Sequence, residues 1–473
     1  MVNLDRTFRP DAASYADPSG RVFHWNDRVF RGIAPDQTEH ARRVMASPAV
    51  RRLQERRMVI DAEPARDTPS PFELLIEHRR ILFPSYCFEW TPQMLADAAT
   101  LTLEIATEIS DEELALQDAY PWNVFFEGTR PIFIDFGSFV PARADALWAP
   151  YDQFCSFFLF PLYLYSVGLY DVARRFLADY LTGLTAERFL QLAPLALKVR
   201  HPLRYARHAS TFHTARLIRR LRLEEPLRDF IRTSYAHGSR TVAPARRRML
   251  KLLAREVAAI RLPAPQSHWS GYYDDLGSYT EAESARKQAL VAEVLSRHAP
   301  ATVLDVGCNT GLYSFLAAER GTRVIAVDND ASSVARLHRH ASERGADILP
   351  LVLDVLNPSP SFGWCARQFP SAVERFRVDM VMAFAVIHHL AITGRQGFAR
   401  ALEALEAFST RHILVEFVDA DDPMVVRLRS QSAQDYSWYT FEGFTAAVHR
   451  RAKNVALLTP HSPTRRFVLY EKL

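Results

Sequence analysis

Lysine and cysteine are scarce in this 473-residue sequence, and each scarcity excludes a kind of site. The four cysteines, at positions 87, 155, 308 and 365, lack the close spacing of zinc ligands or of a disulfide framework. We therefore expect reduced thiols in a cytosol. The first lysine of the chain is Lys198. Any fixed cation before it must be an arginine, whose planar guanidinium is not equivalent to an ammonium group.

Long apolar runs are also rare. Residues 1–20 contain no apolar core, so we expect no signal peptide. Phe154–Tyr170 carries no charge, but it is short for a membrane span and contains Pro161. We interpret it as a buried core helix and expect a cytoplasmic protein without a transmembrane segment. The length predicts two or three domains, and a hydrophobic content of 48% is sufficient for well-packed cores.

The most informative stretch is Ala301–Gly311, ATVLDVGCNTG. An apolar run with the length of a buried strand breaks into GCNTG at 307–311, and Leu312–Arg320 follows with helical spacing. Strand, glycine turn and helix open a doubly wound α/β sheet, which binds ligands beyond the carboxyl ends of its strands. The next apolar run, Arg323–Asp330, contains Asp328. A carboxylate there is suited to accept hydrogen bonds from both ribose hydroxyls of a nucleoside.

The pattern Asp305-x-Gly307-x-Asn309-x-Gly311 resembles the first motif of class I S-adenosylmethionine-dependent methyltransferases. Asn309 stands where that family often has a glycine, whereas NAD-binding folds prefer G-x-G-x-x-G. The resemblance continues along the C-terminal half and implies a Rossmann-like, seven-stranded α/β sheet. The segments identified with its further strands are Ile348–Val355, Val378–Leu390 (the fourth strand and the loop that follows it), His412–Val418, and an antiparallel pair at Asn454–Leu458 and Arg466–Lys472.

The resemblance implies a site for S-adenosyl-L-methionine in the loops that follow these strands. Asp354 would contact the adenine amino group, and Phe384 with Ala385 would form the pocket wall beside the methionine part of the donor. Tyr273, before the first motif, would fold over the cofactor or anchor the next helix on the sheet. The implied cofactor-binding residues are Asp305, Gly307, Cys308, Asn309, Gly311, Asp328, Asn329, Asp354, Val355, Phe384 and Tyr273.

Methyl transfer to a hydroxyl also needs a base, because neutral alcohols are weak nucleophiles. His388 and His389 follow the fourth strand, where such a base would stand, and histidine titrates near neutral pH. One of the two would face the pocket, and the other would pack or cap the next helix. Glu416, near the end of the fifth strand, is the alternative: a base, an orienting group or a structural residue. Adjacent histidines without a third ligand at metal spacing do not predict a metal centre.

The first part of the chain predicts an α+β domain. We expect a hairpin at Arg21–Ile33, a helix from Gln37 to Arg57 and a helix over Met94–Ile109. Two apolar strands are expected between these helices, at Arg57–Ala62 and Phe72–Leu82.

A second motif lies in Leu114–Phe139, where Asp118 and Asn123 precede Asp135-Phe136-Gly137. It resembles the catalytic loop and metal motif of protein kinases and aminoglycoside-type phosphotransferases. The resemblance implies that Asn123 and Asp135 hold the metal of Mg-ATP and that Asp118 is the base. However, Leu116-Gln117 replaces His-Arg, no glycine-rich loop precedes the motif, and no strand lysine is available. A degenerate kinase-like scaffold, an atypical phosphotransferase and a mere turn pattern therefore all stay open.

A basic segment joins the two parts. From Lys198 to Arg261 there are 17 Lys or Arg residues against four acids, whereas the whole chain has a net charge of +4. The segment could hold nucleic acid, acidic lipid headgroups or a phosphorylated substrate. The alternative is a solvated helix face that docks on acidic neighbours. Leucines alternate with the arginines at helical spacing and aromatics are sparse, which does not favour base stacking.

Together these patterns predict a kinase-like domain over residues 1–185, a basic helical connector over 186–262 and a methyltransferase domain over 263–473. We expect methyl transfer to an oxygen of a small-molecule or glycan-type acceptor. The alternatives are a bifunctional kinase–methyltransferase, a nucleic-acid methyltransferase that uses the connector, and a non-catalytic scaffold. The architecture resembles bifunctional kinase–methyltransferases of bacterial surface polysaccharides. The strings DVGCNTG and VIHHL are similar to those of methyltransferases with rhizobial nodulation functions.

Overall fold

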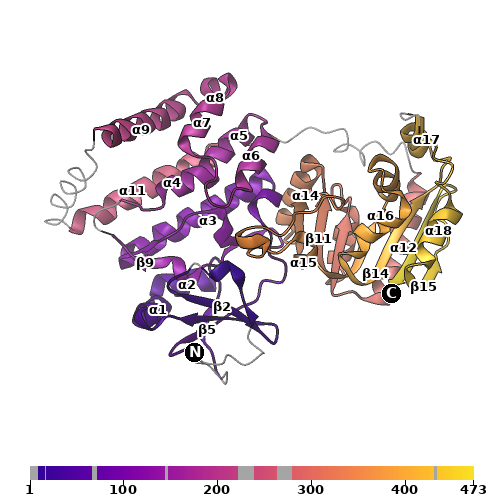
Figure 1. Ribbon diagram of the computed structural model, residues 1–473, viewed down its shortest axis with the longest axis horizontal. Coiled ribbons are helices and arrows are strands. Elements are labelled where there is room, and N and C mark those ends of the chain that lie inside the picture. Colours follow the sequence, from indigo (N-terminus) through magenta and orange to yellow (C-terminus); the bar gives the residue numbers. More distant parts are fainter. Residues whose placement is uncertain are drawn as a thin grey trace. The chain divides into compact units, whose positions relative to one another are not determined.

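The computed structural model describes residues 9–15, 17–66, 72–143, 147–221, 239–263, 280–430 and 434–473. Its contacts divide the chain into two compact units. The first unit consists of residues 1–126, 131–263 and 363–369, and the second of residues 127–130, 264–362 and 370–473. Figure 1 shows the elements of both units along the chain.

The first unit begins with a five-stranded antiparallel sheet in the order β1-β2-β3-β5-β4. The hairpin predicted at Arg21–Ile33 is confirmed, because β2 and β3 pair directly. Its turn residues Asn26 and Asp27 both adopt positive φ, as a tight two-residue hairpin turn requires. The strand predicted over Phe72–Leu82 is present but shorter, whereas the one predicted over Arg57–Ala62 is wrong, because that segment forms only an isolated bridge at Val59 and the strand begins at Ala62. The strands are β1 (Arg9–Pro10), β2 (Gly20–Trp25), β3 (Arg28–Ile33), β4 (Ala62–Pro64) and β5 (Leu75–His78).

The helix predicted from Gln37 to Arg57 is wrong as a single element. α1 (Thr38–Ala46) ends before Ser47, and α2 (Pro48–Glu55) begins with Pro48. Proline cannot donate a backbone hydrogen bond to the preceding turn, so the first helix cannot continue through it. The Ser47 hydroxyl instead caps α2 by accepting a hydrogen bond from the backbone N–H of Val50.

The remainder of the first unit is mainly helical and is built on α3 (Pro92–Ile109), most of which is buried. The uncharged run Phe154–Tyr170 forms a π-helical turn and the buried helix α5, which confirms the prediction of a core helix. In the part of the chain that the structure describes, no helix is long and apolar enough to cross a membrane. The further elements are β6 (Leu114–Leu116), β7 (Val124–Glu127), β8 (Arg130–Phe133), β9 (Phe139–Pro141), α4 (Tyr151–Phe154), α5 (Phe160–Ser166), α6 (Tyr170–Leu177), α7 (Ala186–Leu192), α8 (Leu195–Arg200), α9 (Pro202–Arg220) and α11 (Ser239–Ala258).

The second unit contains the predicted seven-stranded sheet, part of which is labelled in Figure 1. Its strand order is β12-β11-β10-β13-β14-β16-β15. The first five strands in this order are parallel, whereas β16 runs antiparallel to both β14 and β15. The Rossmann-like fold expected for the C-terminal half is therefore confirmed. The strands are β10 (Thr302–Val306), β11 (Arg323–Asp328), β12 (Ile348–Val352), β13 (Val378–Ala383), β14 (Ser409–Val418), β15 (Ala452–Leu457) and β16 (Arg465–Lys472).

Two layers of helices cover this sheet. α12 (Glu281–His298), α13 (Leu312–Ala318) and α14 (Ala331–Arg344) share a core cluster with Met380 and Leu414 of the strands. On the other face, Phe398 of α16 (Gly397–Glu406) and Phe444 of α18 (Phe441–His449) contact Phe417. Because strand residues alternate between faces, Glu416 points toward the α12–α14 layer. The short helices α15 (Ala372–Arg375) and α17 (Pro423–Ser430) complete the unit.

Candidate functional site

The turn between β10 and α13 is the tightest part of the site. Gly307, Asn309 and Gly311 all adopt positive φ, at 69°, 49° and 90°. Asparagine tolerates this conformation better than most residues, which explains why Asn309 can replace a glycine. A Cβ at Gly307 would collide with Val386, and one at Gly311 would collide with Leu337. The glycines are therefore required for packing of the chain itself, and not only for the approach of a ligand.

The predicted acid at the end of β11 lies directly against this turn. The backbone N–H of Asn309 donates to Oδ2 of Asp328 at 3.0 Å, and the N–H of Asp330 donates to Oδ1 at 2.9 Å. Burial raises the pKa of Asp328, and these two hydrogen bonds oppose that rise. Each carboxylate oxygen has a second lone pair, so Asp328 can still accept hydrogen bonds from ribose hydroxyls.

The other predicted cofactor residues differ in exposure. Asp354 and Asn329 are exposed at the carboxyl ends of their strands, whereas Val355 and Cys308 are buried. Oδ1 of Asp354 accepts a hydrogen bond from the N–H of Leu356. Tyr273 lies outside the described residues.

Asp305 is buried beneath the turn rather than open to a ligand. Its Oδ2 accepts a hydrogen bond from the Ser314 hydroxyl at 2.6 Å, which ties β10 to α13. Burial raises the pKa of Asp305 to about 6; nearby Asp328 adds to the rise, while Ser314 and Lys287 oppose it. Asp305 therefore positions the turn from below.

The segment after β13 brings the predicted pocket wall and both histidines together. Phe384 packs edge-to-face on Tyr313 of α13, with ring centroids 4.8 Å apart. The rings of His388 and His389 are 4.2 Å apart, and burial lowers the pKa of both. Both histidines are therefore neutral near pH 7. The Nδ1 atom of His388 is buried without a hydrogen-bond partner among the described residues, so it is suited to meet a ligand or a water.

Glu416 is fully buried and held by two partners. Lys287 of α12 donates to its Oε2 at 2.7 Å, and Nε2 of His461 lies 2.9 Å from its Oε1. Burial alone would raise the pKa of Glu416, but Lys287 and His461 outweigh it and hold the pKa well below its usual range. Glu416 is thus a charged, fixed group at physiological pH.

The sequence reasoning missed both partners of Glu416. Lys287 lies on the buried face of α12 with Val291 and Val294, at a spacing of four and seven residues. A single lysine on the apolar face of a predicted helix could have indicated that Lys287 is buried with an acidic partner. His461 follows β15 in a connecting loop, and no sequence pattern distinguishes it. The Lys287 ammonium also lies 5.0 Å from the ring centre of Tyr313 and 5.6 Å from that of Phe384, so this network borders the predicted pocket wall.

Comparison with known proteins decides the assignment. The family model for "Methyltransferase domain" matches residues 303–407. The chain is 31% identical to the nodulation protein NoeA of Rhizobium meliloti (strain 1021) over 454 residues, which is 94% of this chain and 92% of that protein. The chain belongs to the NoeA family. Its C-terminal half is an S-adenosylmethionine-dependent methyltransferase domain, as the sequence motif predicted.

Two solved structures are similar to parts of this NoeA-family chain. One is magnesium protoporphyrin IX methyltransferase (ChlM) from Synechocystis PCC 6803 with bound SAH, at 14% identity and a TM-score of 0.30 over 40% of this chain and 84% of that chain. The other is the bifunctional kinase-methyltransferase WbdD, at 16% identity and a TM-score of 0.30 over 42% of each chain.

The residues of the second unit fit the methyl donor of the NoeA-family enzyme. The donor supplies a sulfonium methyl group for in-line displacement. Asp328 presents acceptor lone pairs beside the positive-φ turn, at the sheet edge where such folds bind nucleosides. Among the described residues, no group of three or more His, Cys, Asp or Glu side chains is arranged to hold a metal ion.

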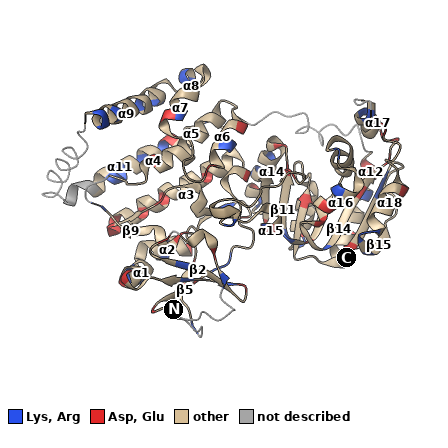
Figure 2. Ribbon diagram, viewed as in Figure 1, with Lys and Arg blue, Asp and Glu red and all other residues tan. Residues whose placement is uncertain are grey.

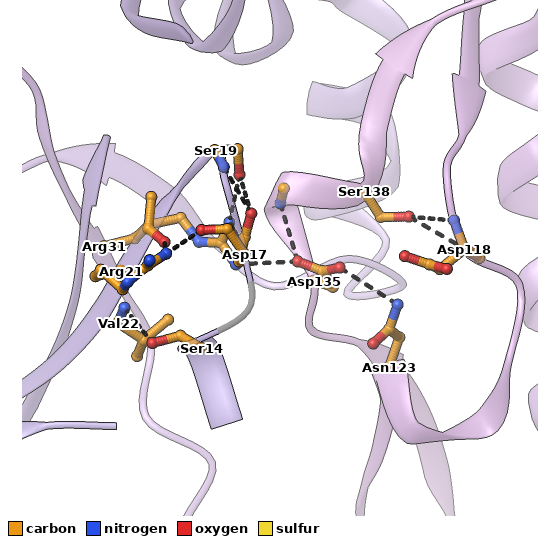
Figure 3. A network of polar contacts seen from close by, with 12 residues as sticks. Ser14, Asp17, Ser19, Arg21, Val22, Arg31, Asp118, Asn123, Asp135 and Ser138 are labelled. Carbon is orange, nitrogen blue, oxygen red and sulfur yellow. Dashed lines mark hydrogen bonds and ion pairs between the residues drawn. The ribbon is translucent and has the colours of Figure 1, made fainter. Parts of the chain in front are cut away.

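The kinase-like motif of the first unit forms a connected polar network (Figure 3). Asn123 donates to Oδ2 of Asp135 at 3.3 Å, and the N–H of Gly137 donates to Oδ1 at 3.0 Å. Asp118 lies close by, where its Oδ1 accepts from Gln153. The motif residues predicted from the sequence are therefore brought together.

One guanidinium group forms ion pairs with two carboxylates of this network. Arg31 of β3, whose side chain is only 7% exposed, forms ion pairs with Oδ1 of Asp135 at 3.0 Å and with Oδ2 of Asp17 at 2.7 Å. Burial raises the pKa of Asp135, and the Arg31 charge opposes that rise. Both oxygens of Asp135 thus face nitrogen donors. Oδ1 of Asp135 accepts from Arg31 and Gly137, whereas Oδ2 accepts from Asn123 at 3.3 Å and keeps a second lone pair.

A buried acid, Glu256, joins the helices of the basic connector to α5 of the same unit. Glu256 of α11 is buried and accepts hydrogen bonds from Tyr163 and Arg207, while Nε2 of His208 lies 3.2 Å from its Oε1. Burial disfavours the charge of Glu256, but these partners lower its pKa below the usual range. Most other charges of α8, α9 and α11 are basic (Figure 2).

Proposed function

We propose that this NoeA-family protein transfers a methyl group from S-adenosylmethionine to a hydroxyl oxygen of a small-molecule or glycan-type acceptor. The observation that carries the proposal is the buried, unpartnered Nδ1 of neutral His388, directly after β13 and on the segment that contains Phe384. A hydroxyl acceptor loses a proton on methylation, and a neutral imidazole can accept it.

The three predicted catalytic residues have different roles in this proposal. His388 is the base, and His389 packs against it and sets its orientation. Glu416 does not take the proton, because Lys287 and His461 stabilise its charged form. It holds Lys287 against the aromatic wall and so shapes the pocket. Tyr273 stays a proposed lid residue.

An oxygen acceptor is favoured over a nucleic-acid base. The segment after β13 reads FAVIHHL at 384–390 and contains no N/D-P-P-Y-type string for the amino group of a base. Nucleic-acid methylation by means of the basic connector is the weaker alternative, since α9 is anchored by His208 and Arg207 on Glu256 and presents few aromatic side chains for stacking.

We infer that the chain consists of a kinase-like α+β domain (1–185), a helical connector (186–262) and the methyltransferase domain (263–473). In this proposal the first domain binds the acceptor or a partner and transfers no phosphoryl group, because Asp135 is paired with Arg31 and the sequence has no lysine before Lys198. A cytoplasmic location accords with four free cysteines.

The test uses purified full-length protein, methyl-labelled donor and a panel of hydroxyl-bearing oligosaccharides, nucleic acids and protein. We expect label in a carbohydrate or small-molecule fraction, loss of transfer in His388→Gln and only partial loss in His389→Gln. Donor binding measured by calorimetry should be unchanged in both variants. Label only in nucleic acid, or full transfer by His388→Gln, would contradict the proposal.

A further inference from the structure

Helices α8 and α9 carry large aliphatic side chains that are almost fully exposed. Leu195 is 75% exposed, Val199 72% and Leu203 85%. Leu197 of α8 is buried at 1% exposure, so α8 packs on its unit through that side chain, and Leu195 and Val199 are exposed together with Lys198. Scattered exposed leucines are ordinary, but Leu195, Val199 and Leu203 are three large exposed aliphatic side chains within nine residues, and they form an apolar stripe along the chain across the junction of α8 and α9.

The same segment is strongly basic. Residues 195–221 contain no aspartate or glutamate, and their basic side chains are Lys198, Arg200, Arg204, Arg207, Arg216, Arg219 and Arg220. Figure 2 shows this basic character on α8 and α9. A surface of this kind favours a partner that is both anionic and apolar.

A hollow adjoins the apolar stripe. It has a volume of about 480 Å³ and is lined by Arg200, His201, Leu203, Arg204 and Arg261, together with Pro202 and Ala259. The described lining contains no acidic side chain. Arg200 donates to the backbone oxygen of Ser166 at 2.6 Å, and Nε2 of His201 lies 3.3 Å from the Ser166 hydroxyl, so the floor of the hollow is fixed to α5. Leu203 belongs to both the hollow and the stripe.

We propose that this face of α8 and α9 binds the surface of a lipid bilayer with anionic headgroups. The arginines of the hollow receive headgroup phosphates, and Leu195, Val199 and Leu203 enter the boundary between headgroups and acyl chains. Nucleic acid would not use exposed aliphatic side chains. A second copy of the chain in a two-fold dimer would place the same basic residues against each other, which is electrostatically unfavourable.

The experiment is co-sedimentation of the full-length protein with vesicles. We expect binding to vesicles of equal parts phosphatidylcholine and phosphatidylglycerol, weak binding to phosphatidylcholine alone, and release at high salt, because the Debye length falls from about 10 Å at 0.1 M to about 3 Å at 1 M.

The double variant Arg204→Gln/Arg261→Gln should weaken binding roughly thirtyfold, since each basic residue near an anionic surface contributes about fivefold. Leu195→Ser/Leu203→Ser should weaken it by roughly tenfold or more.

Matched controls lie elsewhere in the first unit. Leu181→Ser removes an equally exposed leucine, and Arg43→Gln removes an exposed arginine of α1; neither should change binding. Equal binding to both vesicle types, no binding to either, or unchanged binding by both double variants would overturn the proposal. If the leucine variant instead abolishes a concentration-dependent dimer in the absence of lipid, and vesicles are not bound, the face is a self-association surface and the proposal is wrong. Circular dichroism checks that each variant is folded.

Discussion

The Lys287 ammonium nitrogen lies 2.7 Å from Oε2 of Glu416, and both side chains are buried between α12 and the sheet of the second unit. Each of the two charges stabilises the other in this buried position, and His461 adds to the stabilisation of Glu416. Burial lowers the pKa of Lys287, and the adjacent carboxylate opposes that change. The pair therefore joins the helix before the glycine turn to the strand that ends beside the proposed pocket.

Replacing Lys287 by methionine should lower the free energy of unfolding by about 3–5 kcal/mol, because it leaves Glu416 charged and buried with one partner fewer. Denaturant unfolding measures this loss. The exposed pair Arg323–Asp347 on the same sheet, at 3.1 Å, is the matched control: Arg323→Ala should change the stability by less than about 1 kcal/mol. Equal effects of the two substitutions would show that burial of the pair is not important.

Asp328→Ala should weaken donor binding by about 1–3 kcal/mol, since it removes the acceptor for the ribose hydroxyls and for the N–H of Asn309. Isothermal titration calorimetry with S-adenosylmethionine and with its demethylated product measures the change. Asp347→Ala, at the edge of the same sheet, should bind normally. Unchanged affinity in Asp328→Ala would place the nucleoside elsewhere.

Asp305 should make the stability of the protein fall as the pH rises. Its pKa is about 6 in the folded state against 3.8 for an ordinary aspartate. Between these values the folded state holds more protons than the unfolded state, so the free energy of unfolding decreases with increasing pH and levels off above the folded pKa. Asp305→Asn should remove this decrease, so its free energy of unfolding relative to the wild type should increase by roughly 2 kcal/mol from pH 4 to pH 7. Thermal unfolding of both proteins at several pH values tests it; parallel curves would contradict it.

Much of the methyltransferase site could be predicted from the sequence because its signals are local. The strand–glycine–helix unit and the acid at the end of β11 are short patterns, and the fold brings Asn309 and Asp328 together as expected. The network around Glu416 could not be predicted in the same way, because its hydrogen bonds join residues 129 and 45 positions apart. Arg31 and Asp135, 104 positions apart, present the same difficulty. In the first unit, Pro48 divides the predicted helix into α1 and α2. The helical repeat of 3.6 residues in the hydrophobic pattern does not by itself show where one helix ends and the next begins.

Asp135→Asn should destabilise the first unit by about 3 kcal/mol, because it leaves buried Arg31 with Asp17 as its remaining charged partner. Asp118→Asn is the control, since its carboxylate receives a neutral donor, Gln153, and its loss should have a smaller effect.

Thermal-shift titration with Mg-ATP should give no change in the wild type or in Asp135→Asn. A shift in the wild type that disappears in Asp135→Asn would instead establish a nucleotide site.

The hydrogen bond from Asn309 to Asp328 also has a consequence for biogenesis. Asn309 lies in the turn after β10 and Asp328 at the end of the neighbouring parallel strand β11, with α13 between them in the chain. The proposed nucleoside site therefore does not exist until that crossover has closed. A partly folded chain therefore could not capture cellular methyl donor. Because the donor would bind only the fully folded sheet, a high concentration of donor would raise the free energy of unfolding of folded molecules and would not stabilise partly folded ones.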